Sequence, residues 1–97
     1  MILYIDTTQN GLIELGLKDK NKLVAVKKFS SHRTQAEKLL PAIEKLLKVN
    51  KLKLSNLCGI EVENSGGSFT SLRIGVVTAN ALAYALGIPV TGLGKTD

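Results

Sequence analysis

Five short apolar runs along the chain predict β-strands. The first three, at residues 1–5, 12–17 and 23–29, are rich in strand-forming residues, and polar or glycine-containing turns separate them. Connections this short favour antiparallel neighbours. Residues 58–63 predict a fourth strand, and residues 90–93 begin a fifth.

The spacing of apolar residues changes to a helical period after Thr34. Thr34 and Glu37 have capping-box spacing, which suits a helix start because their side chains satisfy exposed amide groups. Pro41 lies inside the segment, where we expect it to kink the first turns or delay the regular helix. The apolar positions form the stripe of an amphipathic helix, at Ala36, Leu39, Leu40, Ile43, Leu46 and Leu47.

A second helix is predicted from residue 69 or 70 to residue 86. Gly87 ends it and Pro89 prevents its resumption. There is no charged residue between Arg73 and Lys95. A helix that is apolar on all sides must be covered on all sides, and one sheet covers only one of them. We therefore expect a partner protein to cover the outer side.

The order of these elements is β-β-β-α-β-α-β, which predicts an α/β fold. Three antiparallel strands followed by two right-handed crossovers give a five-stranded mixed sheet in the order 3-2-1-4-5. This is the ribonuclease H-like layout, which is also one half of the actin-like ATPase (ASKHA) architecture. Residues 1–97 are expected to form one such domain.

Small residues at successive i+4 positions predict a smooth ridge along the second helix. Packing of this ridge into the domain's own sheet is as good an explanation as a partner, but it leaves the rest of the helix uncovered. We expect the two helices to form a self-complementary patch, through which two copies associate as a four-helix bundle. The predicted interface comprises Leu39, Leu40, Ile43, Leu47, Gly75, Ala79, Leu82 and Ala83.

Composition indicates the cellular location of the protein more clearly than its function. The net charge of +5 comes from lysines grouped at residues 18–28 and 38–53, where turns and a helix face favour solvated side chains over nucleic-acid contacts. Cys58 is the single cysteine, lies in an apolar run, and is expected to be a buried free thiol of a cytoplasmic protein. Asp6 interrupts the apolar start, which argues against a signal peptide. Residues 74–90 are too short and broken to span a bilayer comfortably.

Residues 65–75 carry a resemblance to a known family. They read Ser-Gly-Gly-Ser-Phe-Thr-Ser-Leu-Arg-Ile-Gly, which is similar to the TsaB (YeaZ) signature Gly-Pro-Gly-Ser-Phe-Thr-Gly-Leu-Arg-Ile-Gly. Ser65 and Gly66 replace the usual Gly-Pro, and Ser71 replaces a glycine. The motif loop at the start of the second helix comprises Gly66, Gly67, Ser68, Phe69, Thr70 and Arg73. Residues 5–7, 37–41 and 83–89 match the family in order and spacing as well.

The resemblance implies a non-catalytic partner subunit in the formation of threonylcarbamoyladenosine on tRNA. Family members pair with the catalytic paralogue TsaD, or with themselves, through the two N-terminal helices, and the small ATPase TsaE joins the assembly. We expect a homodimer when the chain is alone, and tRNA contacts that are at most indirect. Family members are about twice as long, so residues 1–97 correspond to the N-terminal domain, without the second lobe.

Two catalytic alternatives stay open at this point. Ribonuclease H-like nucleases hold two divalent ions with carboxylates at the ends of two strands and on the first helix, where Asp6, Glu63 and Glu37 stand. ATP binding is the other alternative, since Asp6 begins the segment that corresponds to the first phosphate-binding loop of the kinase-like fold. However, Thr8 stands where a glycine would let backbone amides approach the phosphate. His32 has no second metal ligand nearby. We therefore expect no catalytic residue, no metal and no cofactor.

Overall fold

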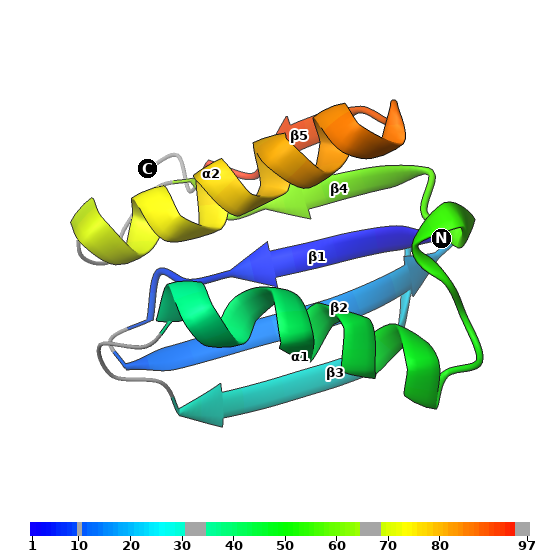
Figure 1. Ribbon diagram of the computed structural model, residues 1–97, viewed down its shortest axis with the longest axis horizontal. Helices are drawn as coiled ribbons and strands as arrows, with labels where there is room; N and C mark the ends of the chain where they lie inside the picture. The colour runs from blue at the N-terminus through cyan, green and yellow to red at the C-terminus, as the bar shows by residue number, and fades with distance from the viewer. Residues whose placement is uncertain (10, 31–34, 65–68, 95–97) are drawn as a thin grey trace.

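The computed structural model describes residues 1–9, 11–30, 35–64 and 69–94 of the 97-residue chain (Figure 1). The regular elements follow one another in the order expected, with one short 3-10 helix added. They are β1 (Ile2–Asp6), β2 (Leu12–Asp19), β3 (Lys22–Ser30), α1 (Gln35–Val49), the 3-10 helix η1 (Leu54–Asn56), β4 (Gly59–Val62), α2 (Phe69–Leu86) and β5 (Val90–Gly92).

The five strands form one mixed sheet in the order β3-β2-β1-β4-β5. β1 pairs antiparallel with β2, and β2 pairs antiparallel with β3. β1 and β4 are parallel, as are β4 and β5. Both crossovers carry a helix, and Figure 1 shows α1 and α2 on the same face of the sheet. The predicted α/β, ribonuclease H-like architecture is therefore confirmed.

The core lies between this face of the sheet and the two helices. Alternation along the strands places every second side chain on the helix side. On β1 these are Leu3 and Ile5, which are opposite Leu17 and Leu15 of β2. All four are fully buried. The helices and β4 complete the cluster with Leu39, Ile43, Leu46, Leu47, Ile60, Val62, Ala79 and Ala83.

The small-residue ridge of α2 faces the sheet, which corrects the predicted interface. A side chain added at Gly75 would place its Cβ 2.5 Å from Oγ1 of Thr7, so the glycine allows α2 to approach the end of β1. On α1, Leu39, Ile43 and Leu47 of the apolar stripe are buried inside the domain and so are not available to a partner. Six of the eight predicted interface residues are buried inside the domain: Leu39, Ile43, Leu47, Gly75, Ala79 and Ala83.

Two local expectations also differ from the structure. α1 begins at Gln35, ahead of Pro41, so of the two effects expected of the proline the delayed helix start does not occur. Cys58 is exposed rather than buried. Its Sγ lies 3.3 Å from the amino group of Met1 and 3.4 Å from the Met1 carbonyl oxygen, because Cys58 and Met1 directly precede the paired strands β4 and β1.

Candidate partner-binding face

The outer face of α2 is apolar and largely uncovered. Only one side of the helix contacts the sheet, so the residues on the opposite side stand out from the domain. The side chain of Val77 is 60% exposed and that of Tyr84 is 91% exposed. Ala81 and Ala85 are also exposed. Because α2 carries no charge after Arg73, this face has the composition of an interface centre rather than of an ordinary surface.

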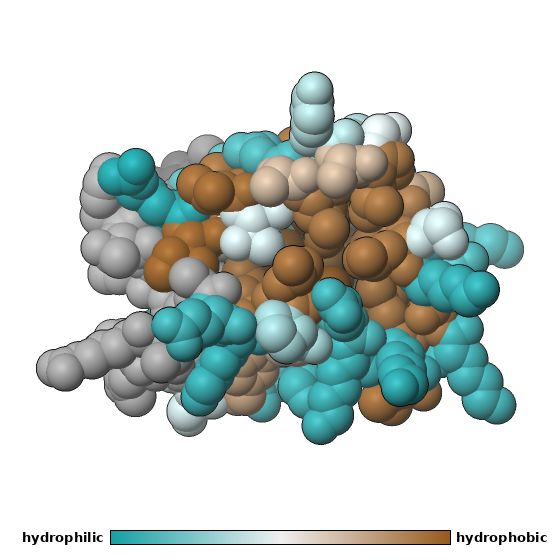
Figure 2. Space-filling model, in the orientation of Figure 1, coloured by the Kyte–Doolittle hydropathy of each residue, from teal (hydrophilic) through white to brown (hydrophobic). Residues whose placement is uncertain are grey.

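A groove of about 380 Å³ separates α1 from the outer side of α2. One wall is Leu40, which is 42% exposed on α1. Figure 2 views the molecule from the helix side and shows apolar side chains gathered across its middle, with hydrophilic side chains below them. The groove lining is almost entirely aliphatic: Leu40, Val77, Thr78, Ala81, Leu82 and Ala85.

A second, shallower hollow of about 230 Å³ continues the groove towards the start of α2. Arg73, Ile74, Val77 and Thr78 line it. Arg73 is the first exposed charge at this end of the helix. The two hollows together can receive apolar side chains of a second protein, and each fully buried aliphatic side chain would contribute about 1.5–3 kcal/mol. We refer below to the residues that line both hollows, together with Tyr84, as the helix face.

Two of the eight predicted interface residues belong to the helix face. They are Leu40, which is exposed, and Leu82, which is half-buried in the groove wall. Sequence reasoning missed Val77, Ala81, Tyr84 and Ala85. A helical projection could have found them, because these positions lie opposite Ala79 once the ridge is assigned to the sheet.

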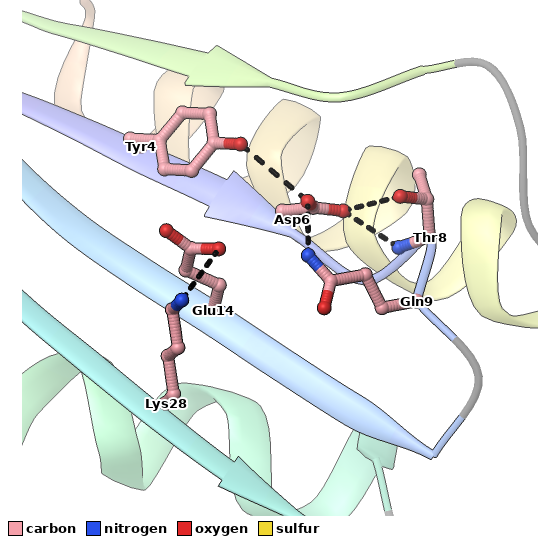
Figure 3. Close-up of polar contacts among 6 residues, drawn as sticks. All are labelled: Tyr4, Asp6, Thr8, Gln9, Glu14 and Lys28. Carbon is pink, nitrogen blue, oxygen red and sulfur yellow. Dashed lines mark hydrogen bonds and ion pairs between the residues drawn. The ribbon is translucent and has the colours of Figure 1, made fainter.

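The buried carboxylate of Asp6 organises the turn that follows β1. It accepts hydrogen bonds from the Thr8 amide at 2.8 Å and from the Thr8 hydroxyl at 2.5 Å (Figure 3). The amide group of Gln9 donates to its second oxygen at 3.4 Å, and the Tyr4 hydroxyl donates at 3.5 Å. These contacts explain why an acidic side chain that is 3% exposed is tolerated there.

The environment of Tyr4 is strongly unfavourable for its ionised form. Burial raises the pKa of Tyr4 well above its usual range, and the negative charges of Asp6, Glu63 and Glu14 raise it further. Lys28 lies 4.0 Å from Glu14, and Lys18 lies 2.6 Å from Glu61 and over the Tyr4 ring (Figure 3 shows the first pair). The charged side chains around Tyr4 on this side of the sheet are therefore engaged in structural pairs.

The three carboxylates proposed for a nuclease do not form one site. Asp6 and Glu63 are buried at the ends of β1 and β4, whereas Glu37 is exposed on α1. Within residues 1–9, 11–30, 35–64 and 69–94, no three histidine, cysteine or acidic side chains are grouped so that they could hold a metal ion. The structure does not support the nuclease alternative.

The family-motif loop lies partly outside the described residues. Gly66, Gly67 and Ser68 are among these undescribed positions, as are Thr34 and His32. Phe69 and Thr70 begin α2. Within the same motif, Gly75 has the structural role already given, because it makes room for Thr7. No helix in the described part of the chain has both the length and the apolar content needed to cross a membrane.

Comparison with known proteins points to one family. The model of the family described as TsaD, tRNA N6-adenosine threonylcarbamoyltransferase, matches residues 28–96. The tRNA threonylcarbamoyladenosine biosynthesis protein TsaB of Bacillus subtilis (strain 168) is 29% identical over 96 residues, which are 99% of this chain and 42% of that protein. The structure of YeaZ from Pseudomonas aeruginosa matches with a TM-score of 0.86 and 27% identity, covering 96% of this chain and 43% of that one.

A more distant structural likeness concerns the fold alone. RuvC from Thermus thermophilus matches with a TM-score of 0.58 at 15% identity, covering 96% of this chain and 63% of that one. The domain is thus an α/β unit of the ribonuclease H-like class. The chain belongs to the TsaD family, and within it to the TsaB (YeaZ) proteins. It spans less than half the length of the TsaB and YeaZ proteins that it matches.

Proposed function

We propose that this chain is a non-catalytic subunit that binds and activates TsaD in the formation of threonylcarbamoyladenosine on tRNA. The observation that carries the proposal is the helix face, which is apolar, uncharged along α2 beyond Arg73, and hollowed between the two helices. Exposing such a surface to water is unfavourable, and burying it against another protein removes that cost.

The nature of the partner follows from the family. The TsaD family model covers residues 28–96, which include both helices, so a protein of that family would present a related helix pair. Two related pairs can meet about a two-fold or pseudo-two-fold axis as a four-helix bundle. A stable contact of this kind buries about 1,200–2,000 Å² in total. The same surface would form a homodimer when TsaD is absent.

The remaining parts of the proposal concern the assembly and its setting. Asp6 serves the turn after β1, which supports a structural rather than a catalytic role for this edge of the sheet. We assign TsaE to the same assembly on the strength of family membership, with tRNA contacted at most indirectly. The single free thiol of Cys58 suits the reducing cytoplasm, where we place the complex.

Charged substitutions on the helix face test the proposal. In Val77→Glu and Ala81→Glu the new carboxylate would be buried without a partner on association, so we expect Kd for TsaD to rise roughly thirtyfold or more, equivalent to about 2 kcal/mol. Both positions are exposed, so the domain should stay folded. Static light scattering after size exclusion, with and without TsaD, measures association, and circular dichroism monitors the fold.

Two matched variants separate association from folding. Val49→Glu makes the same chemical change at a 71% exposed residue outside the groove lining, and it should leave TsaD binding unchanged. Ala79→Glu places the charge in the core, where the alanine is fully buried, and should unfold the domain. A folded wild-type chain that stays monomeric at high concentration and ignores TsaD would refute the proposal, as would full binding by Val77→Glu.

A further inference from the structure

Among the described residues, the outermost strand of the sheet, β3, is paired on one side only. The sheet order places β3 at an edge next to β2 only, and the strand is nine residues long. Such an edge presents free N–H and C=O groups to any extended chain that approaches it. Its aliphatic side chains are unusually accessible, since Leu23 is 51%, Val24 is 55% and Val26 is 46% exposed.

The register of β3 divides it into an irregular and a regular part. A shift in pairing between Leu17 and Lys18 disturbs the start of the strand near Val24. From residue 25 to residue 30 the pairing with β2 is continuous, so this stretch has the straight geometry that a further strand requires. Val26 is opposite Gly16, and the Leu23 side chain also lies over that glycine. The two side chains form a shallow aliphatic strip on the face of the sheet away from the helices.

The charges along this edge have one sign. Between Asp19 and Glu37 the sequence contains Lys20, Lys22, Lys27 and Lys28 but no acidic residue. Lys28 is only loosely engaged by Glu14, at 4.0 Å and with 58% of its side chain exposed. An exposed pair of this length contributes little to stability, so its lysine is available to another carboxylate. The edge therefore selects for negative charge.

We propose that the β3 edge binds an extended acidic peptide segment of a partner protein, which adds to the sheet as a strand alongside β3. Main-chain hydrogen bonds between the segment and β3 would supply affinity, and alternate side chains of the segment would supply specificity. Acidic residues of the segment would meet Lys22 and Lys27 on the helix side of the strand, while its apolar residues would cover Leu23 and Val26 on the opposite side. RNA fits this edge less well, because aliphatic side chains separate Lys22 from Lys27, and Phe29, the one aromatic residue of β3, is half-buried against the core instead of free to stack on bases.

This surface is separate from the helix face, since α1 and α2 lie on the opposite side of the sheet from Leu23 and Val26. The two sites can therefore be tested independently. The probe for the β3 edge is a fluorescein-labelled peptide of alternating glutamate and valine, about as long as β3 itself. Binding to the full 97-residue chain is measured by fluorescence anisotropy, and a lysine–valine peptide and a single-stranded RNA oligonucleotide serve as comparison probes.

Charge reversal locates the binding. The double variant Lys22→Glu/Lys27→Glu should weaken binding of the acidic peptide about tenfold or more, because attraction becomes repulsion. The matched control Lys45→Glu/Lys48→Glu changes the net charge by the same amount on the exposed side of α1, and should alter the affinity less than about threefold. Amide hydrogen exchange should slow selectively within residues 25–30 when the peptide is bound, which simple charge attraction would not produce.

Several results would overturn the inference. No binding of the acidic peptide at low salt excludes the site, as does equal binding of the lysine–valine peptide. Equal loss in the α1 control variant shows that net charge alone attracts the peptide. Slowed exchange in α1 or α2 instead of β3 moves the peptide to the helix face. Binding of the RNA oligonucleotide with none of the acidic peptide would make the edge a nucleic-acid surface instead.

Discussion

Replacing Gly75 by alanine tests how closely α2 must approach the end of β1. The new Cβ would lie 2.5 Å from Oγ1 and 3.4 Å from Cγ2 of Thr7. Thr7 is fully buried, so its side chain cannot turn aside into solvent. Helix propensity alone favours alanine by about 0.8–1.0 kcal/mol, whereas overpacking a core costs about 1–3 kcal/mol. The contact is far below van der Waals distance, so we expect a net loss of about 1–2 kcal/mol.

Thermal and urea unfolding followed by circular dichroism measure this loss. For a domain of this size, 1 kcal/mol corresponds to a shift in Tm of about 4–8 °C, so Gly75→Ala should melt roughly 5–15 °C below the wild type. Asn80→Ala is the matched control, because Asn80 is exposed on the same helix and gains propensity without a clash. It should be as stable as the wild type or slightly more stable.

A double-mutant cycle identifies the cause of the loss. Thr7→Ala removes the two closest atoms that the new Cβ would meet, at the cost of the interaction that the threonine makes in the wild type. Gly75→Ala combined with Thr7→Ala should therefore be more stable than the sum of the single losses by about 1 kcal/mol. Strict additivity, or a Gly75→Ala variant as stable as the wild type, would refute the close approach as the reason for glycine.

Two further predictions concern single positions. Gly87, which follows α2, has a φ of +67° and nothing within 4 Å of an added Cβ. Gly87→Ala should therefore lower the free energy of unfolding by about 1 kcal/mol through backbone strain alone. Urea unfolding measures this loss, and an unchanged midpoint contradicts it. For Tyr4, whose pKa is raised in the folded state, the unfolded chain loses its proton first as pH rises, so stability should fall above about pH 10. Tyr4→Phe should flatten this alkaline loss, and an identical pH profile for both proteins would show that other groups cause it.

The architecture was predictable because local patterns specify it. Runs of strand-forming residues, short turns and the helical stripe of α1 determine the element order, and the handedness of crossovers then leaves one arrangement of the sheet. The distances within the candidate sites were not predictable in this way. The spacing of Asp6, Glu37 and Glu63 along the chain matches that of a nuclease site. In the folded domain, however, Glu37 is exposed on α1, and the Asp6 carboxylate accepts hydrogen bonds within the turn after β1.

The orientation of α2 shows most clearly what the local sequence pattern does not determine. α1 has one apolar stripe, and Leu39, Ile43 and Leu47 of this stripe are buried in the core, so these three residues cannot also form an outer face. α2 is apolar around its whole circumference, so its sequence says that the helix must be covered but not which side meets the sheet. The sheet selects the smallest side chains, Ala79 and Ala83, because the backbone of α2 then comes closest to the strands, and Val77 and Tyr84 are left outside. That choice depends on shape complementarity between elements distant in sequence, which only the folded domain provides.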